Sequence, residues 1–330
     1  VAFAGAAAAD VSVSGSAELG IADQDHNGDD ELGFFSSVDV RFSMTGETDG
    51  GLAFGATIDL DDALEAAEDG EIGDNTNNDS IDYTIFASGG FGTLTYGDTD
   101  GAMDWALTEG GNVGNPGSIN DAETAYEGYV GDYLDSFGDG MIARYDYAFG
   151  DYAFAVSIDQ GTDGTNADAE TGYAVGFKGN VAGVSFGIAH QEAATVVDLS
   201  LTGVSVGYTM GNLSAGIMVA SGDVQQDINA TLTAQLLDID SVQLGVGYTS
   251  GALSLHANYA ELELSNAAGS VDADGFGIAA AYDLGGGASV HFGYGDGSAT
   301  ATVAPVSPAT TPTVTTADNG RFSLGLSMSF

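Results

Sequence analysis

The last ten residues of the chain, 321–330, read RFSLGLSMSF and alternate strictly between two kinds of side chain. The even-numbered positions are all apolar: Phe322, Leu324, Leu326, Met328 and Phe330. The odd-numbered positions hold Arg321, Gly325 and serines. Because successive side chains of a β-strand point to opposite sides of a sheet, the stretch predicts a strand with one apolar face and one polar face.

The same alternation recurs along the chain. In the segment 33–46, Val38, Val40 and Phe42 alternate with Asp39 and Arg41. Sixteen segments follow the pattern, at about 11–21, 33–46, 51–60, 81–88, 92–97, 140–149, 152–159, 172–180, 182–190, 202–210, 213–220, 241–249, 252–262, 274–283, 288–296 and 321–330. Their polar faces carry too much charge, glycine and serine to fill a dry core. The sequence therefore predicts an all-β fold, a transmembrane up-and-down antiparallel β-barrel of sixteen strands with its apolar faces outward.

Short and long connections alternate between these segments. The long ones are 22–32, 61–80, 98–139, 160–171, 191–201, 221–240, 263–273 and 297–320. An up-and-down barrel with both chain ends at one rim requires this alternation, whereas a sandwich with Greek-key crossings would not separate the two classes. The segment 221–240 has two open interpretations, because it either extends a strand or lies flat in the loop.

Composition limits the class of function. Lys and Arg number 4 and Asp and Glu 49, so the formal net charge is −45. This charge repels nucleic-acid phosphates and favours cations as partners. The chain has no Cys, which excludes disulfides and thiolate metal sites. No run of about 18 apolar residues occurs, so the sequence predicts no transmembrane helix.

The first nine residues look like the end of a secretory signal, with Ala7 and Ala9 before a cut at Asp10. A flexible Ala-rich terminus is the alternative. We therefore predict a signal remnant or unpaired terminus over 1–9 and a single barrel domain over 10–330.

The connection 98–139 stands out by its length and composition. It is rich in carboxylates, has no Lys or Arg, and holds the single tryptophan of the chain, Trp105. A connection this long in a regular β pattern is usually functional or disordered. Its aromatic residues argue against disorder. We expect it to fold back into the barrel and narrow the lumen.

Three stretches carry a resemblance to a known family: the opening DVSVSGSAELGI (10–21), TYGDTDGAMDWA (95–106) at the entry of the third long loop, and the closing RFSLGLSMSF. Together they resemble the trimeric general-diffusion porins of Gram-negative bacteria, particularly the alphaproteobacterial type. The resemblance covers about 10–330. It implies an outer-membrane homotrimer, surrounded by lipid bilayer and lipopolysaccharide, that passes small hydrophilic solutes and ions passively.

The resemblance also implies that the third loop forms an eyelet opposite a basic wall. This chain departs from that pattern because it has only four basic side chains. By strand parity Arg41 and Arg144 point inward at similar heights and are predicted to line the constriction. Arg321 is placed near the outer mouth and Lys178 near the periplasmic rim. Pairing of Arg41 with Asp39 or Asp59, and of Arg144 with Asp146, is an open alternative or a coexisting role.

The loop supplies the opposing carboxylates. The candidates are Asp98, Asp100, Asp104, Glu109, Asp121, Glu123 and Glu127. One carboxylate about 8 Å from a passing ion acts with ~0.5 kcal/mol in water-like dielectric, and several together reach ~1.4 kcal/mol. That energy is a tenfold bias, so we predict cation preference, reduced at high salt.

A calcium or magnesium site is a further candidate. Asp23, Asp25 and Asn27 match the first half of a calcium loop, D-x-D-x-N-G, but Phe34 occupies the twelfth position where an acid is needed. An intact EF-hand is excluded. A looser site that uses Glu31, or an acidic solvated turn without metal, both remain open. Bound divalent ions would bridge the acidic loops to lipopolysaccharide phosphates. No cofactor is otherwise expected.

Enzymatic activity is not predicted. The four histidines are scattered along the chain, and no phosphate-binding loop, HExxH or nucleophile elbow is present. Two alternatives to a general channel remain: a calcium-dependent acidic surface or adhesion scaffold, and a substrate-specific channel in which Trp105 and nearby tyrosines form an aromatic slide.

Overall fold

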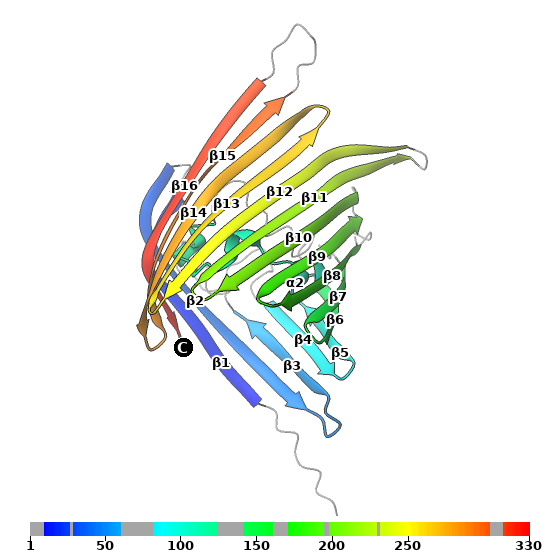
Figure 1. Ribbon diagram of the computed structural model, residues 1–330, viewed down its shortest axis with the longest axis vertical. Helices are drawn as coiled ribbons and strands as arrows, with labels where there is room; N and C mark the ends of the chain where they lie inside the picture. Colours follow the sequence, from blue (N-terminus) through cyan, green and yellow to red (C-terminus); the bar gives the residue numbers. More distant parts are fainter. Residues whose placement is uncertain are drawn as a thin grey trace, which may run out of the picture.

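The computed structural model describes residues 10–26, 29–60, 82–124, 141–160, 171–194, 198–229, 232–303 and 313–330. These residues form sixteen strands (Figure 1). The strands are β1 (Asp10–His26), β2 (Asp29–Glu47), β3 (Ala53–Asp59), β4 (Asp82–Gly89), β5 (Gly92–Gly97), β6 (Met141–Phe149), β7 (Tyr152–Gln160), β8 (Thr171–Val181), β9 (Val184–Ala194), β10 (Asp198–Met210), β11 (Leu213–Asn229), β12 (Leu232–Ser250), β13 (Leu253–Asn266), β14 (Gly269–Gly285), β15 (Ala288–Val303) and β16 (Thr313–Ser329).

Each strand pairs antiparallel with its neighbours in the sequence, and β1 pairs with β16 to close the barrel. The closing register places Ser16 opposite Ser329 and Leu19 opposite Leu326. The amide of Phe330 also donates a hydrogen bond of 2.9 Å to the carbonyl of Gly15. Closure pairs the first strand of the sheet with the last, as a barrel in lipid requires. The predicted sixteen-strand barrel is confirmed.

Strand β7 shows how the two faces of the wall differ. Phe154, Val156 and Ile158 are 37%, 43% and 49% exposed, whereas the intervening Ala155 and Ser157 are 1% and 6% exposed. The apolar side chains therefore lie on the outside of the barrel and the small or polar ones inside, as the sequence predicts. Among the described residues, no helix is long and apolar enough to cross a membrane.

Several predicted long loops are strands instead. The β1–β2 pair continues to His26 and Asp29, within the predicted loop 22–32. Similar extensions occupy most of 221–240, 263–273 and 297–320. The segment 221–240 thus extends strands β11 and β12, with register shifts after Val224 and Asp227. Beyond the apolar belt both faces of a strand are wet, so backbone pairing persists without the hydrophobic alternation that marks a strand in the sequence.

Candidate functional site

The segment after β5 enters the barrel and follows its inner wall. It contains α2 (Ala102–Ala106), η1 (Gly110–Asn112) and η2 (Ile119–Asp121). Helix α2 contacts β7, β8 and β9; η1 contacts β10 to β13; and η2 contacts β15, β16 and β1. Figure 1 shows these short helices within the ring of strands. We call residues 98–124 the lumen segment. The remainder of the predicted loop, 125–139, lies outside the described residues.

Glycines of the wall make room for the lumen segment. A Cβ atom added to Gly176 would collide with Ala102, and one added to Gly245 would collide with the carbonyl of Gly110. At Gly277 it would collide with the carbonyl of Glu123. The same holds at Gly203, which faces Leu107, and at Gly216, which faces Val113. The inward glycines of β8 to β14 therefore form a seat on which the lumen segment lies directly against the sheet.

Polar side chains of the wall complete the hydrogen bonding of this segment. Backbone groups removed from water need such partners. Ser157 Oγ accepts from the amide of Ala102 (2.8 Å), and Ser205 Oγ accepts from the amide of Thr108 (2.9 Å). His256 Nε2 lies 2.7 Å from the carbonyl of Gly111, and His291 Nδ1 lies 2.9 Å from that of Gly117. These serines and histidines were not predicted as site residues. Their positions in the strand alternation indicate only that their side chains face inward.

Apolar contacts add to the attachment. Met103 and Ile119 are 0% exposed, and Ala106 is 2% exposed. Met103, Ala106 and Leu107 belong to a buried cluster with inward alanines of β7 to β9. The lumen segment is therefore packed against the wall over its described length.

Two of the basic residues contact the lumen segment. Arg144 Nη1 donates to the carbonyl of Asp100 (2.6 Å), and its side chain is 11% exposed. Its Nη1 lies 3.6 Å from the Asp100 carboxylate, and its Nε lies 3.9 Å from that of Asp146. Lys178 Nζ donates to the carbonyl of Trp105 (2.5 Å) and sits 3.7 Å from the centre of the indole ring. Lys178 thus reaches the segment, rather than serving only the periplasmic rim.

Arg41 lies in a different setting. Its Nε donates to Asp59 Oδ2 at 2.7 Å, and its side chain is 60% exposed. A recess of about 490 Å³ surrounds this pair on the inner face of β2 to β4. Its lining includes Arg41, Ser43, Thr57, Asp59, Asp82, Thr84 and Asp98. The contacts of α2, η1 and η2 run along the other arc of the wall, from β7 through β16 to β1. The recess therefore borders the water-filled part of the lumen.

The other predicted constriction residues divide by exposure. Asp98, Asp100 and Asp121 are exposed, and Asp104 and Glu109 are half-buried. Asp39 accepts a hydrogen bond of 2.5 Å from Ser16 Oγ on the inner face. Glu123 is only 1% exposed and accepts from Asn115 Nδ2 (3.0 Å) and from Ser118 Oγ, so it does not face the water of the lumen. Glu127 lies outside the described residues.

The carboxyl of Asp121 has a raised pKa. Although the side chain of Asp121 keeps contact with solvent, the protein atoms around its carboxyl displace part of its hydration, and this desolvation raises the pKa of the Asp121 carboxyl above its ordinary value. The charge of Glu123 is the second cause. Both causes disfavour the charged form. Asp121 therefore takes up a proton at higher pH than an ordinary carboxyl.

The remaining predicted residues lie away from the constriction. Arg321 is exposed on β16, on the face of Ser323, whose hydroxyl contacts Ser118. Asp23 is half-buried in β1. Asn27, and the side chains of Asp25 and Glu31, lie outside the described residues. No group of three or more acidic, His or Cys side chains that could hold a metal occurs in the described part of the chain.

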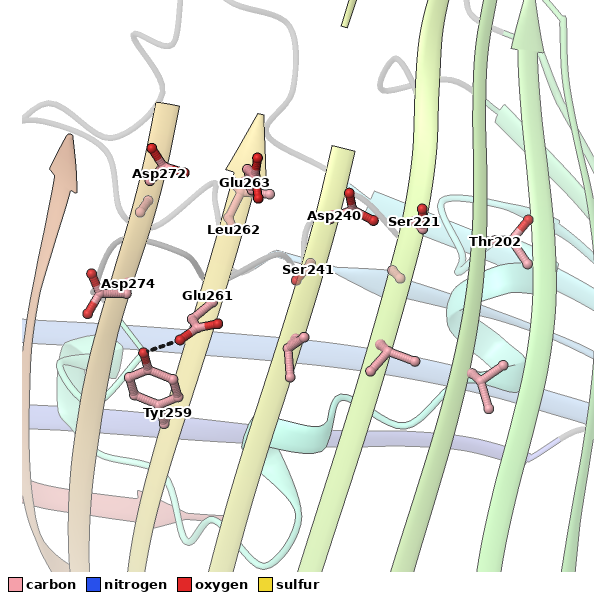
Figure 2. A pocket seen from close by; sticks show the side chains of 15 residues that line it. Thr202, Ser221, Asp240, Ser241, Tyr259, Glu261, Leu262, Glu263, Asp272 and Asp274 are labelled. Carbon is pink, nitrogen blue, oxygen red and sulfur yellow. Dashed lines mark hydrogen bonds between the residues drawn. The ribbon is translucent and has the colours of Figure 1, made fainter. Parts of the chain in front are cut away.

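Carboxylates also lie on the outer wall, where strand prediction did not place them. Figure 2 shows five of them on neighbouring strands beside a recess of about 650 Å³: Asp240, Glu261, Glu263, Asp272 and Asp274. The register pairs Asp240 with Glu263 and Glu261 with Asp274. Tyr259 donates to Glu261 Oε1 at 2.5 Å. On β13, Glu261 and Glu263 lie on the outer face, opposite to the face on which His256, Asn258 and Ala260 are buried. Glu263 and Asp272 fall in the predicted loop 263–273 and Asp240 in the predicted loop 221–240, whereas Glu261 and Asp274 lie at the ends of predicted strands.

Comparisons with known proteins agree with this architecture. The family model described as Gram-negative porin matches residues 1–302. A porin of Rhodobacter capsulatus is 26% identical over 299 residues, with 87% of this chain and 94% of that protein covered. A refined porin structure has a TM-score of 0.70 at 24% identity and covers 97% of this chain and 100% of the other. The trimer form of OmpT from Vibrio cholerae has a TM-score of 0.67 at 13% identity, with 98% and 100% covered. The chain belongs to the Gram-negative porin family, whose members are non-enzymatic β-barrel channels of the outer membrane.

Proposed function

We propose that this outer-membrane diffusion channel prefers cations. The observation that supports it is the recess beside Arg41, where three carboxylates, Asp59, Asp82 and Asp98, surround one guanidinium. Two other basic side chains, Arg144 and Lys178, are engaged by the lumen segment. The net negative charge at the water-filled side of the lumen stabilises a passing cation and repels an anion, as acidic rings do in other channels.

The expected bias follows from the distances in a water-filled pore. Each net charge about 8 Å from the ion contributes ~0.5 kcal/mol, so a few net charges give between a few-fold and tenfold preference. Reversal potentials under a KCl gradient in planar bilayers test this. The sign must correspond to K⁺ preference and the potential must shrink as ionic strength rises. A reversal potential of anion sign would refute the proposal.

We further propose that the protein works as a homotrimer. Members of this family are typically trimeric, and the solved OmpT of Vibrio cholerae is described in a trimer form. Conductance steps in groups of three in planar bilayers are expected. The absence of any conductance would instead support the acidic scaffold as the function of the barrel.

The substrate-specific channel has less support. A slide of exposed aromatic rings needs Trp105 to be available to solutes, but Trp105 is half-buried and lies under the ammonium of Lys178. Tyr126, Tyr129 and Tyr133 lie outside the described residues. General diffusion is therefore the better supported function of the channel.

Divalent cations are proposed as partners of the outer wall. Arg41, Arg144, Lys178 and Arg321 are the only Lys and Arg residues of the chain and all lie on the lumen side, so the outer wall carries neither Lys nor Arg. Its like charges stand opposite one another across strands, as Asp240 and Glu263 do, which is unfavourable without a counter-ion. Calcium or magnesium shared between these carboxylates and lipopolysaccharide phosphates would neutralise both surfaces.

A further inference from the structure

Helix α2 is too short to hold its own position. It has five residues, begins after Gly101 without a side-chain cap, and has no basic residue of its own in the last turn. Helices of this length are unstable in isolation, because the cost of nucleation is not recovered by so few hydrogen bonds. The place of α2 in the lumen must therefore be set by groups of the barrel wall.

The wall holds α2 at both ends. At its start, Arg144 donates to the carbonyl of Asp100, and Ser157 accepts from the amide of Ala102. Near its end, Lys178 Nζ donates to the carbonyl of Trp105, a group at the carbonyl-rich end of the helix where a cation is favourable. The same ammonium lies over the indole ring at 3.7 Å.

The glycines of the wall under α2 explain why a side chain as long as that of Lys178 is needed at this position. Gly176 and Gly187 let the helix lie directly on the sheet, because a Cβ at either position would collide with Ala102 or Ala106. Lys178 is two residues beyond Gly176 on the same inward face and pairs with Gly187 in the register. Its ammonium reaches both the carbonyl and the indole ring of Trp105. Glycine provides the close approach, and lysine opposes the motion away from the wall.

We propose that Lys178 is the positioning residue of the constriction, which fixes α2 against the wall through Trp105. The proposal deepens the channel function and rests on it, but does not depend on the sign of the selectivity. Release of this contact lets the Trp105 end of α2 move into the lumen. The open channel then fluctuates between conductances, while the barrel itself stays folded.

Trp105 is the only tryptophan of the chain and therefore reports its own position. The test compares acrylamide quenching of its fluorescence in the intact trimer of the wild type and of Lys178→Met. Methionine keeps an apolar stem but removes the charge and the donor. Loss of an exposed cation–π contact shifts the positional equilibrium of α2 roughly two- to fivefold toward the released position, so acrylamide quenching of Lys178→Met must exceed that of the wild type. Open-channel current noise must rise with it.

Two variants separate position from charge. Lys178→Arg keeps a cation that can stack on the ring and must restore quenching and noise toward the wild type. Arg321→Met removes one lumen charge at β16, away from the contacts of α2 with β7 to β9, and must leave quenching unchanged. Unchanged quenching in Lys178→Met, or equal quenching in Arg321→Met, overturns the proposal.

A further variant tests the same contact if the Lys178→Met protein does not assemble. Trp105→Phe keeps the backbone acceptor but weakens the ring contact, so its open-channel noise must exceed that of the wild type. Unchanged noise in Trp105→Phe would also overturn the proposal. A wild-type reversal potential of anion sign would refute the cation preference and leave every quenching comparison intact.

Discussion

Arg144 donates a hydrogen bond of 2.6 Å to the main-chain oxygen of Asp100, two residues before helix α2 begins. This contact separates two arginines that strand parity treats alike. Arg144 is 11% exposed and bound to the lumen segment, whereas Arg41 is 60% exposed and lies beside the open recess. The two residues should therefore differ in how they affect ion flow.

Arg41→Gln should increase the preference for cations more than Arg144→Gln does. Removal of the exposed guanidinium unmasks Asp59 next to the passage, and one unit charge at about 8 Å changes the energy of an ion by ~0.5 kcal/mol, or roughly twofold in the permeability ratio. Reversal potentials under a KCl gradient measure the change. Arg144→Gln should mainly increase current noise, because an anchor of the lumen segment is lost.

Equal shifts in the two single variants would contradict this division of roles. The double variant offers a check on additivity. Arg41 and Arg144 contact different carboxylates, so their effects on the reversal potential should add within experimental error.

Gly245→Ala should destabilise the seat of the lumen segment. The added Cβ would collide with the carbonyl of Gly110, and overpacking of this kind costs about 1–3 kcal/mol. The midpoint of thermal unfolding in detergent should fall, and the single-channel conductance should change because η1 is displaced. Gly90→Ala is the matched control, since nothing lies within 4 Å of a Cβ there. If Gly245→Ala and Gly90→Ala had the same unfolding midpoint and conductance, the lumen segment would be able to move aside at no cost in stability.

Cation preference should start to decline on acidification before ordinary carboxyls titrate. The raised pKa of Asp121 means that this group is neutralised at a higher pH than an ordinary Asp carboxyl as the pH falls. By linkage, the raised pKa also makes the free energy of unfolding fall as pH rises through the folded value. Reversal potentials recorded from pH 7 downward, with Asp121→Asn as control, measure the first effect. A decline of the same form in Asp121→Asn would assign it to other groups.

Calcium should stabilise the barrel if divalent ions bind its acidic surfaces. A ligand at one hundred times its dissociation constant adds about 2.7 kcal/mol to the free energy of unfolding. Melting temperature should therefore rise with added calcium and fall with chelator, and Asp25→Asn should reduce the shift if the 23–31 segment takes part. A melting temperature indifferent to chelation in lipopolysaccharide-containing membranes would count against divalent partners.

The alternation of side chains in stretches such as 321–330 was enough to predict the barrel. A strand in contact with both lipid and water must alternate, because its two faces meet opposite solvents. The same rule placed Arg41 and Arg144 on the inner face. It failed where both faces are wet. In 263–273 the backbone remains paired without a hydrophobic signal, and the outward carboxylates Glu263 and Asp272 were hidden there.

Only the tertiary structure decided what each inward residue touches. Parity gives Arg41, Arg144 and Lys178 the same direction, yet one borders a recess and the other two hold the lumen segment. Glu123 is acidic in the sequence and buried in the fold. The path of residues 98–124 depends on contacts with strands far away in the chain, such as Gly110 with Gly245, and such contacts leave no local periodic pattern to read. Periodicity determined the wall, and long-range packing determined the constriction.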